Sequence, residues 1–137
     1  MAILFQRFTA SRTGFVLRPP GFLELQTRHG PLSPALCLES ESGYVLAGEC
    51  QGAAEIRQLV ALDAEAECAL LEALEGRRPV IIDRLVTDER LLQGYRMRDY
   101  LFTRGVYGLL LAKALEPGVS VARLYGDAFY ISFLEWF

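Results

Sequence analysis

The centre of the chain constrains its fold more than any other part. Ala54–Leu62 is largely apolar, Asp63 follows it as a suitable helix N-cap, and a helix-forming segment runs from Ala64 to Leu74. Gly76 is placed to end this helix, and Val80-Ile81-Ile82 is a continuous apolar run typical of a strand buried on both faces. The order predicts a strand, then a helix, then a buried strand.

The same region also has an interpretation as one long helix over residues 54–74. Asp63 and Glu67 interrupt its apolar face midway, and this break favours the strand followed by the helix. The residues that would share the helical face are Ile56, Leu59, Val60, Leu70, Leu71 and Leu74.

Strong turn signals divide the first fifty residues into short predicted strands. Two of the turns lie between apolar runs and predict hairpins. The predicted elements are a strand at Ile3–Phe8, a hairpin of Phe15–Leu17 with Phe22–Leu25 around Pro19-Pro20-Gly21, and a hairpin of Ala35–Glu39 with Tyr44–Gly48 around Ser40–Gly43.

The last fifty residues contain a short helix, a strand, an apolar segment of undecided type and a final hairpin. These are a helix at Asp88–Gln93 that ends at Gly94, a strand at Tyr95–Thr103, a strand or helix at Val106–Leu115, and a hairpin of Val119–Tyr125 with Ala128–Phe133.

The C-terminal segment Val119–Phe137 carries more aromatic residues than an exposed tail tolerates. Packing in the core is the first expectation for them, and a homo-oligomeric interface is the second. They are Tyr125, Phe129, Tyr130, Phe133, Trp136 and Phe137.

Length and composition indicate one folded domain over residues 1–137, since 52% of the residues are hydrophobic and 23% are charged. The net charge is −3 and no basic run exceeds Arg77-Arg78, so we do not expect a nucleic-acid partner. The most apolar window, Val106–Ala112, is too short to span a bilayer, and the first residues do not resemble a signal peptide. We therefore expect a cytoplasmic protein without a membrane partner.

The cysteines and the single histidine do not form a recognisable site. Cys37, Cys50 and Cys68 are widely spaced and odd in number, which argues against a disulfide framework and against a paired metal motif. His29 lies in a sequence typical of a turn. We expect reduced thiols and no metal site.

From Ala35 to Arg104 the predicted order is hairpin, strand, helix, buried strand, short helix and strand. The buried strand lies in Arg78-Pro79-Val80-Ile81-Ile82-Asp83, and the short helix ends in Leu91-Leu92-Gln93-Gly94-Tyr95. In this order and these motifs the chain resembles a divergent or degenerate member of the GNAT N-acetyltransferase superfamily. The resemblance implies an α+β fold, a central mixed sheet flanked by a few helices, to which the C-terminal hairpin is an addition.

The resemblance also implies an acyl-coenzyme-A-dependent N-acyltransferase, which would use acetyl-coenzyme A to modify an amine of unidentified structure. Glu55 lies on the strand that matches the position of the family's general base, and Glu49 is a more distant second candidate. Backbone groups of Leu59, Val60 and Ala61 would pair with the pantetheine arm of the coenzyme.

Two features depart from the family pattern. Where the family has a glycine-rich turn that receives the coenzyme diphosphate, this chain has Asp63, Glu65 and Glu67, whose charges would repel a diphosphate. The tyrosine that reprotonates the leaving thiolate in the family has no counterpart, because Tyr95 follows the glycine and matches a core phenylalanine.

Three functions therefore stay open, and the sequence does not decide whether the chain is an enzyme. The first is the acyltransferase. The second is a noncatalytic GNAT-like module that has lost the phosphate loop and binds a partner or a second copy of itself through the aromatic C-terminal segment. The third is a scaffold of the roadblock or profilin type, in which residues 54–74 would form one continuous helix.

Overall fold

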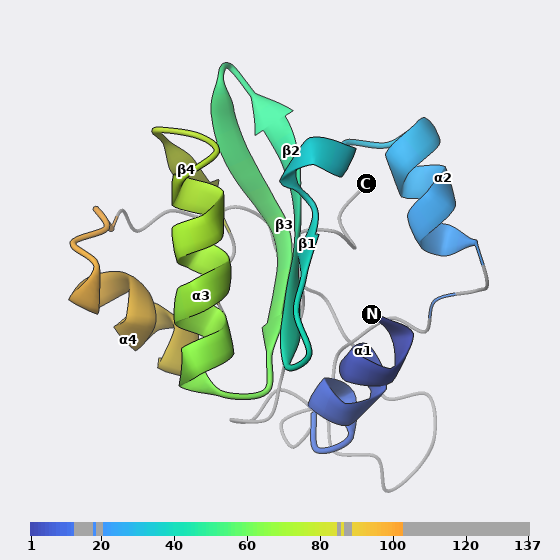
Figure 1. The fold of residues 1–137 in the computed structure, drawn as a ribbon, viewed down its shortest axis with the longest axis horizontal. Helices are drawn as coiled ribbons and strands as arrows, with labels where there is room; N and C mark the ends of the chain where they lie inside the picture. The colour runs from blue at the N-terminus through green and yellow to red at the C-terminus, as the bar shows by residue number, and fades with distance from the viewer. Residues whose placement is uncertain (13–17, 19–20, 85, 87–88, 103–137) are drawn as a thin grey trace, which may run out of the picture.

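A computed structural model describes residues 1–12, 18, 21–84, 86 and 89–102 of the chain. Within these residues the fold is a mixed α+β arrangement around a four-stranded sheet with the order β1-β2-β3-β4 (Figure 1). β1 pairs with β2 and β2 with β3 in antiparallel fashion, whereas β3 and β4 are parallel. The strands are β1 (Leu38–Glu39), β2 (Gly43–Cys50), β3 (Ala53–Ala61) and β4 (Ile81–Asp83).

The hairpin predicted around residues 40–43 is confirmed, with a shorter first strand. The N–H of Ser40 donates to the carbonyl of Gly43 at 2.8 Å and closes the turn between β1 and β2. Pro34–Leu36 forms a short 3-10 helix, η1, so the first two residues of the predicted strand are not extended. Proline at the start of this turn fixes the backbone dihedral that a helical turn requires.

A second hairpin joins β2 to β3 through Gln51 and Gly52. Both residues have positive φ, at 51° and 85°, which is the geometry of the two-residue turn that matches the twist of paired strands. Further along the pair, Ala47 opposes Ile56 while Leu46 opposes Gln58. Arg57 is therefore an extra residue, a β-bulge that shifts the phase of β3.

The strand, helix and strand predicted at the centre of the chain are confirmed. The helix α3 (Ala64–Glu75) follows β3, and the Asp63 carboxylate caps it by accepting the N–H of Ala66 at 2.8 Å. The interpretation of residues 54–74 as one long helix is wrong, because β3 pairs along its length with β2. The continuous helix required by the scaffold interpretation is thus not formed.

β4 is a real strand but differs from the prediction in its burial. Its three residues are half-buried, and Val80 before it is 53% exposed, so it is not buried on both faces. The N–H of Ala54 donates to the carbonyl of Val80 at 2.9 Å, where the parallel pairing begins.

Two predicted strands near the N-terminus are wrong, because both segments are helices. The helix α1 (Ala2–Thr9) buries Leu4 and Phe8, which are four residues apart and so share one helical face. The helix α2 (Phe22–Arg28) replaces the second strand of the predicted hairpin. Residues 15–17, its first strand, lie outside the described residues.

The helix α4 (Glu89–Met97) runs through Gly94, so the predicted stop at this residue is wrong, as is the strand expected from Tyr95 onward. The helix ends later, where Asp99 has a φ of 59° and the N–H of Tyr100 donates to the carbonyl of Tyr95. Gly94 instead allows close packing, since a Cβ there would lie 2.1 Å from Oε1 of Glu67.

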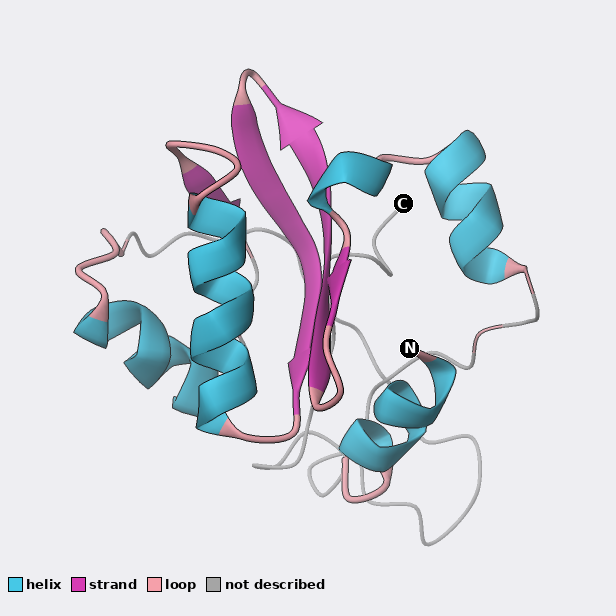
Figure 2. Cartoon of the chain, viewed as in Figure 1, coloured by secondary structure: helices cyan, strands magenta, loops and turns pink. Residues whose placement is uncertain are grey.

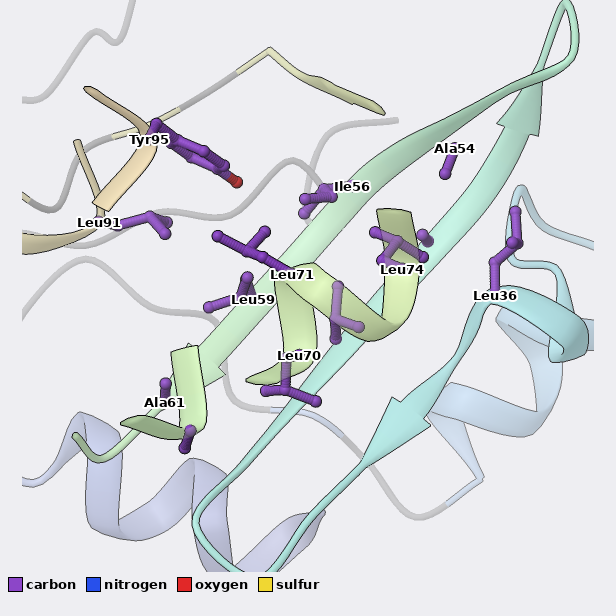
Figure 3. Close-up of a cluster of buried hydrophobic side chains, with 13 residues drawn as sticks. Leu36, Ala54, Ile56, Leu59, Ala61, Leu70, Leu71, Leu74, Leu91 and Tyr95 are labelled. Atoms are coloured by element: carbon purple, nitrogen blue, oxygen red, sulfur yellow. The ribbon is translucent and has the colours of Figure 1, made fainter. Parts of the chain in front are cut away.

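Helices cover both faces of the sheet, α3 and α4 on one side and α1 and α2 on the other (Figure 2). The core on the α3 side includes residues of β3, α3 and α4 (Figure 3). A second core on the α1 side joins Tyr44, Leu46 and Val60 to α1 and Leu32. The central strands β2 and β3 are consequently buried on both faces.

The remaining predictions concern the C-terminal third of the chain. They lie outside the described residues and stay predictions. They are the segment Val106–Leu115, the hairpin within Val119–Phe133 and the placement of the C-terminal aromatic residues.

Candidate functional site

The candidate site lies where β3 runs past the end of β4. Pairing between the two strands stops at Ile56 and Asp83, while β3 continues to Ala61. The N–H of Leu62 donates to the carbonyl of Ser42, the residue before β2, so the backbone of Leu62 faces β2. Backbone groups alternate in direction along a strand. The backbone of Leu59 and Ala61 therefore faces the side of β4.

The three residues predicted to pair with pantetheine are thus not equivalent. Leu59 and Ala61 direct their backbone groups toward the side of β3 on which β4 lies, at positions past the end of the pairing with β4. Val60 lies two positions before Leu62, so its backbone groups face β2 as those of Leu62 do, and its side chain lies in the core on the α1 side.

Side chains of α4 lie against this part of β3. Nη2 of Arg90 donates to the carbonyl of Ala61 at 2.7 Å, and Nη1 lies 3.5 Å from the carbonyl of Leu62. Leu91 and Tyr95 extend from α4 into the core that contains Ile56 and Leu59 (Figure 3). The guanidinium of Arg90 therefore lies against the part of β3 that extends past β4, while Leu91 and Tyr95 belong to the core on the α3 side.

Tyr95 joins α4 to the end of β4. Its hydroxyl donates to Oδ2 of Asp83 at 2.7 Å, and its ring is almost fully buried against Tyr100, with 4.8 Å between ring centroids. Burial, followed by the neighbouring Asp83 carboxylate, raises the pKa of Tyr95 well above its usual value. The side chain packs as a core aromatic residue, with its polar end satisfied by Asp83.

Glu55 is 3% exposed and lies on the opposite face of β3 from Ile56. Its Oε2 accepts a hydrogen bond from Nη2 of Arg57, and its Oε1 accepts one from Nε of Arg84. Arg57 is the bulge residue, and Arg84 follows β4. The carboxylate is thus held between two guanidinium groups, each bound to a different oxygen.

Glu49, the second base candidate, is not brought near this group. It lies on β2 opposite Ala54, and its carboxylate pairs with Nη2 of Arg78 at 2.8 Å. Strand alternation places its side chain on the face of the sheet that α3 covers, whereas Glu55 is on the other face.

The start of α3 is acidic, and its N-cap carboxylate already accepts a backbone hydrogen bond. Asp63 caps the helix, and Glu65 and Glu67 lie in its first turn. The Glu67 side chain is almost fully buried, and its Oε2 lies 3.5 Å from Nε of Arg90. Arg90 therefore spans the end of β3 and the first turn of α3.

A further polar cluster lies on the α1 face. Oε1 of the buried Gln58 accepts hydrogen bonds from the Tyr44 hydroxyl at 3.0 Å and from Nη1 of Arg18 at 2.7 Å. The Arg18 guanidinium also lies over the ring of Phe5, 4.3 Å from its centroid.

The sequence interpretation selected Glu55 and missed the residues that surround it. Arg57 is two positions along the same strand, so its side chain could have been placed beside Glu55 once a strand was assumed. Arg84 and Arg90 lie 29 residues or more from their partners on β3, and only the observed pairing of β3 with β4 and α4 brings them close.

No group of three potential metal ligands occurs in the part of the chain that the structure describes. Of the helices in that part, none combines the length and apolar character needed to cross a membrane. Comparison of the chain with protein-family models, curated proteins and solved structures returned no match.

Proposed function

We propose that this chain is a GNAT-like domain whose coenzyme cleft is closed by its own side chains, and that it acts as a noncatalytic partner-binding module. The order of elements supports the fold assignment. An antiparallel hairpin leads into β3, α3 crosses to a parallel β4, and β3 extends beyond the point where that pairing ends.

The contacts of Arg90 are the observation that carries the proposal. Its guanidinium binds the carbonyl of Ala61, which an extended ligand would otherwise use for pairing along β3. The same group lies against Glu67 at the start of α3. One side chain thereby occupies both the strand edge and the neighbourhood of the helix N-terminus.

The negative charge at the start of α3 also supports the proposal that no coenzyme binds there. A helix N-terminus binds phosphate through free N–H groups and the positive end of its dipole. Here the Asp63 carboxylate accepts the N–H of Ala66, and Glu65 and Glu67 add negative charge in the first turn. A diphosphate at this position would meet repulsion and a donor that is already engaged.

The state of Glu55 supports a structural role for its carboxylate. A general base needs an oxygen directed at the proton that it removes. Both oxygens of Glu55 accept hydrogen bonds from arginine, and the side chain is buried. The group is arranged to hold β3, the bulge and the end of β4 together.

Thermal unfolding with and without millimolar acetyl-coenzyme A tests the proposal. A ligand that binds only the folded state stabilises it, by about 2.7 kcal/mol at a hundred times its dissociation constant. We expect an unchanged unfolding temperature. A saturable rise with coenzyme concentration, absent with adenosine diphosphate as a control, would contradict the closed cleft.

The acyltransferase is the second candidate, and the length of β3 is the observation that favours it. Leu59 directs its backbone groups toward the β4 side of β3 at a position past the end of the pairing with β4. On this candidate, acetyl-coenzyme A binds saturably and Glu55→Gln abolishes transfer to an amine while leaving coenzyme binding intact. If Glu55→Gln lost both coenzyme binding and transfer to the amine, the variant would have a folding defect.

We propose that the partner is a second copy of this chain. The aromatic residues in the sequence of Val119–Phe137 support this proposal. Light scattering of the full chain at increasing concentration is the test. We expect a dimer or a larger homo-oligomer at micromolar concentration. A monomer across the whole range would contradict self-association and leave the closed cleft untouched.

A further inference from the structure

We draw no further inference here: the strongest candidate, the exposed apolar patch of Met97, Leu101 and Phe102 at the end of α4, carries none because nothing in the described part of the chain shows what covers it.

Discussion

The two faces of β3 are both buried but differ in chemistry. The face toward α3 presents Ala54, Ile56, Leu59 and Ala61, which pack against other apolar side chains. The opposite face carries the apolar Val60 and, in addition, Glu55 and Gln58, whose side-chain oxygens accept hydrogen bonds from arginine and tyrosine. The buried polar residues of this strand therefore belong to a hydrogen-bonded network, because an unmatched buried charge would be costly.

The bulge at Arg57 allows the two faces to coexist on one strand. Because of the extra residue, Ile56 and Leu59 face α3 although they are three positions apart. Without it, strict alternation would direct Leu59 to the polar face and Gln58 to the apolar core.

Truncation of a side chain packed against the apolar face of β3 should lower the unfolding free energy most. Leu71→Ala removes a fully buried side chain from the core between α3 and β3, and we expect a loss of about 2–5 kcal/mol in unfolding free energy. Urea denaturation measures it. The matched control, Leu25→Ala, changes an exposed leucine and should cost less than about 0.5 kcal/mol. Similar losses in the two variants would contradict the assigned core.

Removal of the carboxylate tests the polar face. Glu55→Ala leaves Arg57 and Arg84 without their shared partner, and we expect a loss on the order of 3 kcal/mol. Chemical denaturation of this variant and of Glu41→Ala, an exposed control, gives the comparison. If Glu55→Ala were as stable as the control, the carboxylate would not hold the two arginines, and its availability as a base would regain support.

Loss of the contact between α4 and the end of β3 should lower the unfolding free energy by an intermediate amount. Arg90→Ala removes the donor to the carbonyl of Ala61 and the cation beside the buried Glu67, so we expect a loss of about 1–3 kcal/mol. Arg28→Ala, which breaks an exposed ion pair with Glu24, is the matched control. Equal stability of the two variants would remove the main support for a closed cleft.

Loss of the ion pair between Arg98 and Glu75, which lies outside both faces of β3, should lower the unfolding free energy least. Arg98 donates to Glu75 and lowers the pKa of this carboxyl below its usual value, an effect to which the Tyr100 hydroxyl adds. The resulting stabilisation is present above the unfolded-state pKa and is lost as the pH falls through the folded-state pKa.

Glu75→Gln should accordingly be less stable than the natural chain at pH 7, by under about 1 kcal/mol because the pair is partly exposed. The difference should close in acid. Urea denaturation of both proteins at pH 7 and pH 3 measures it, and a difference that widened in acid would reverse the assigned sign.

The sequence predicted the central elements because their signals are local. Asp63 at the helix start and the polar turn at residues 40–43 both act through neighbouring backbone groups. The helices α1 and α2 were missed because neither has a side-chain cap to mark its beginning. Gly94 was misread as a stop because its packing against Glu67 depends on tertiary structure.

The candidate site was predictable only in part for the same reason. Glu55 could be selected from its position on β3, but its ionic partners depend on the bulge and on the parallel pairing with β4. The bulge also explains the ambiguity of residues 54–62, since a spacing of three between Ile56 and Leu59 is more typical of a helix than of a strand.

The proposal that side chains close the coenzyme cleft predicts no binding, and amide chemical shifts of the isotope-labelled chain during titration with acetyl-coenzyme A to millimolar concentration test it. The amides that report on the cleft are those of Leu59 and Ala61 on β3 and of Ala64 and Ala66 at the start of α3. We predict that their shifts stay unchanged. Saturable shifts at these four amides, with the rest of the spectrum unaffected, would show that the coenzyme binds beside β3 and α3 and would contradict the proposed closure.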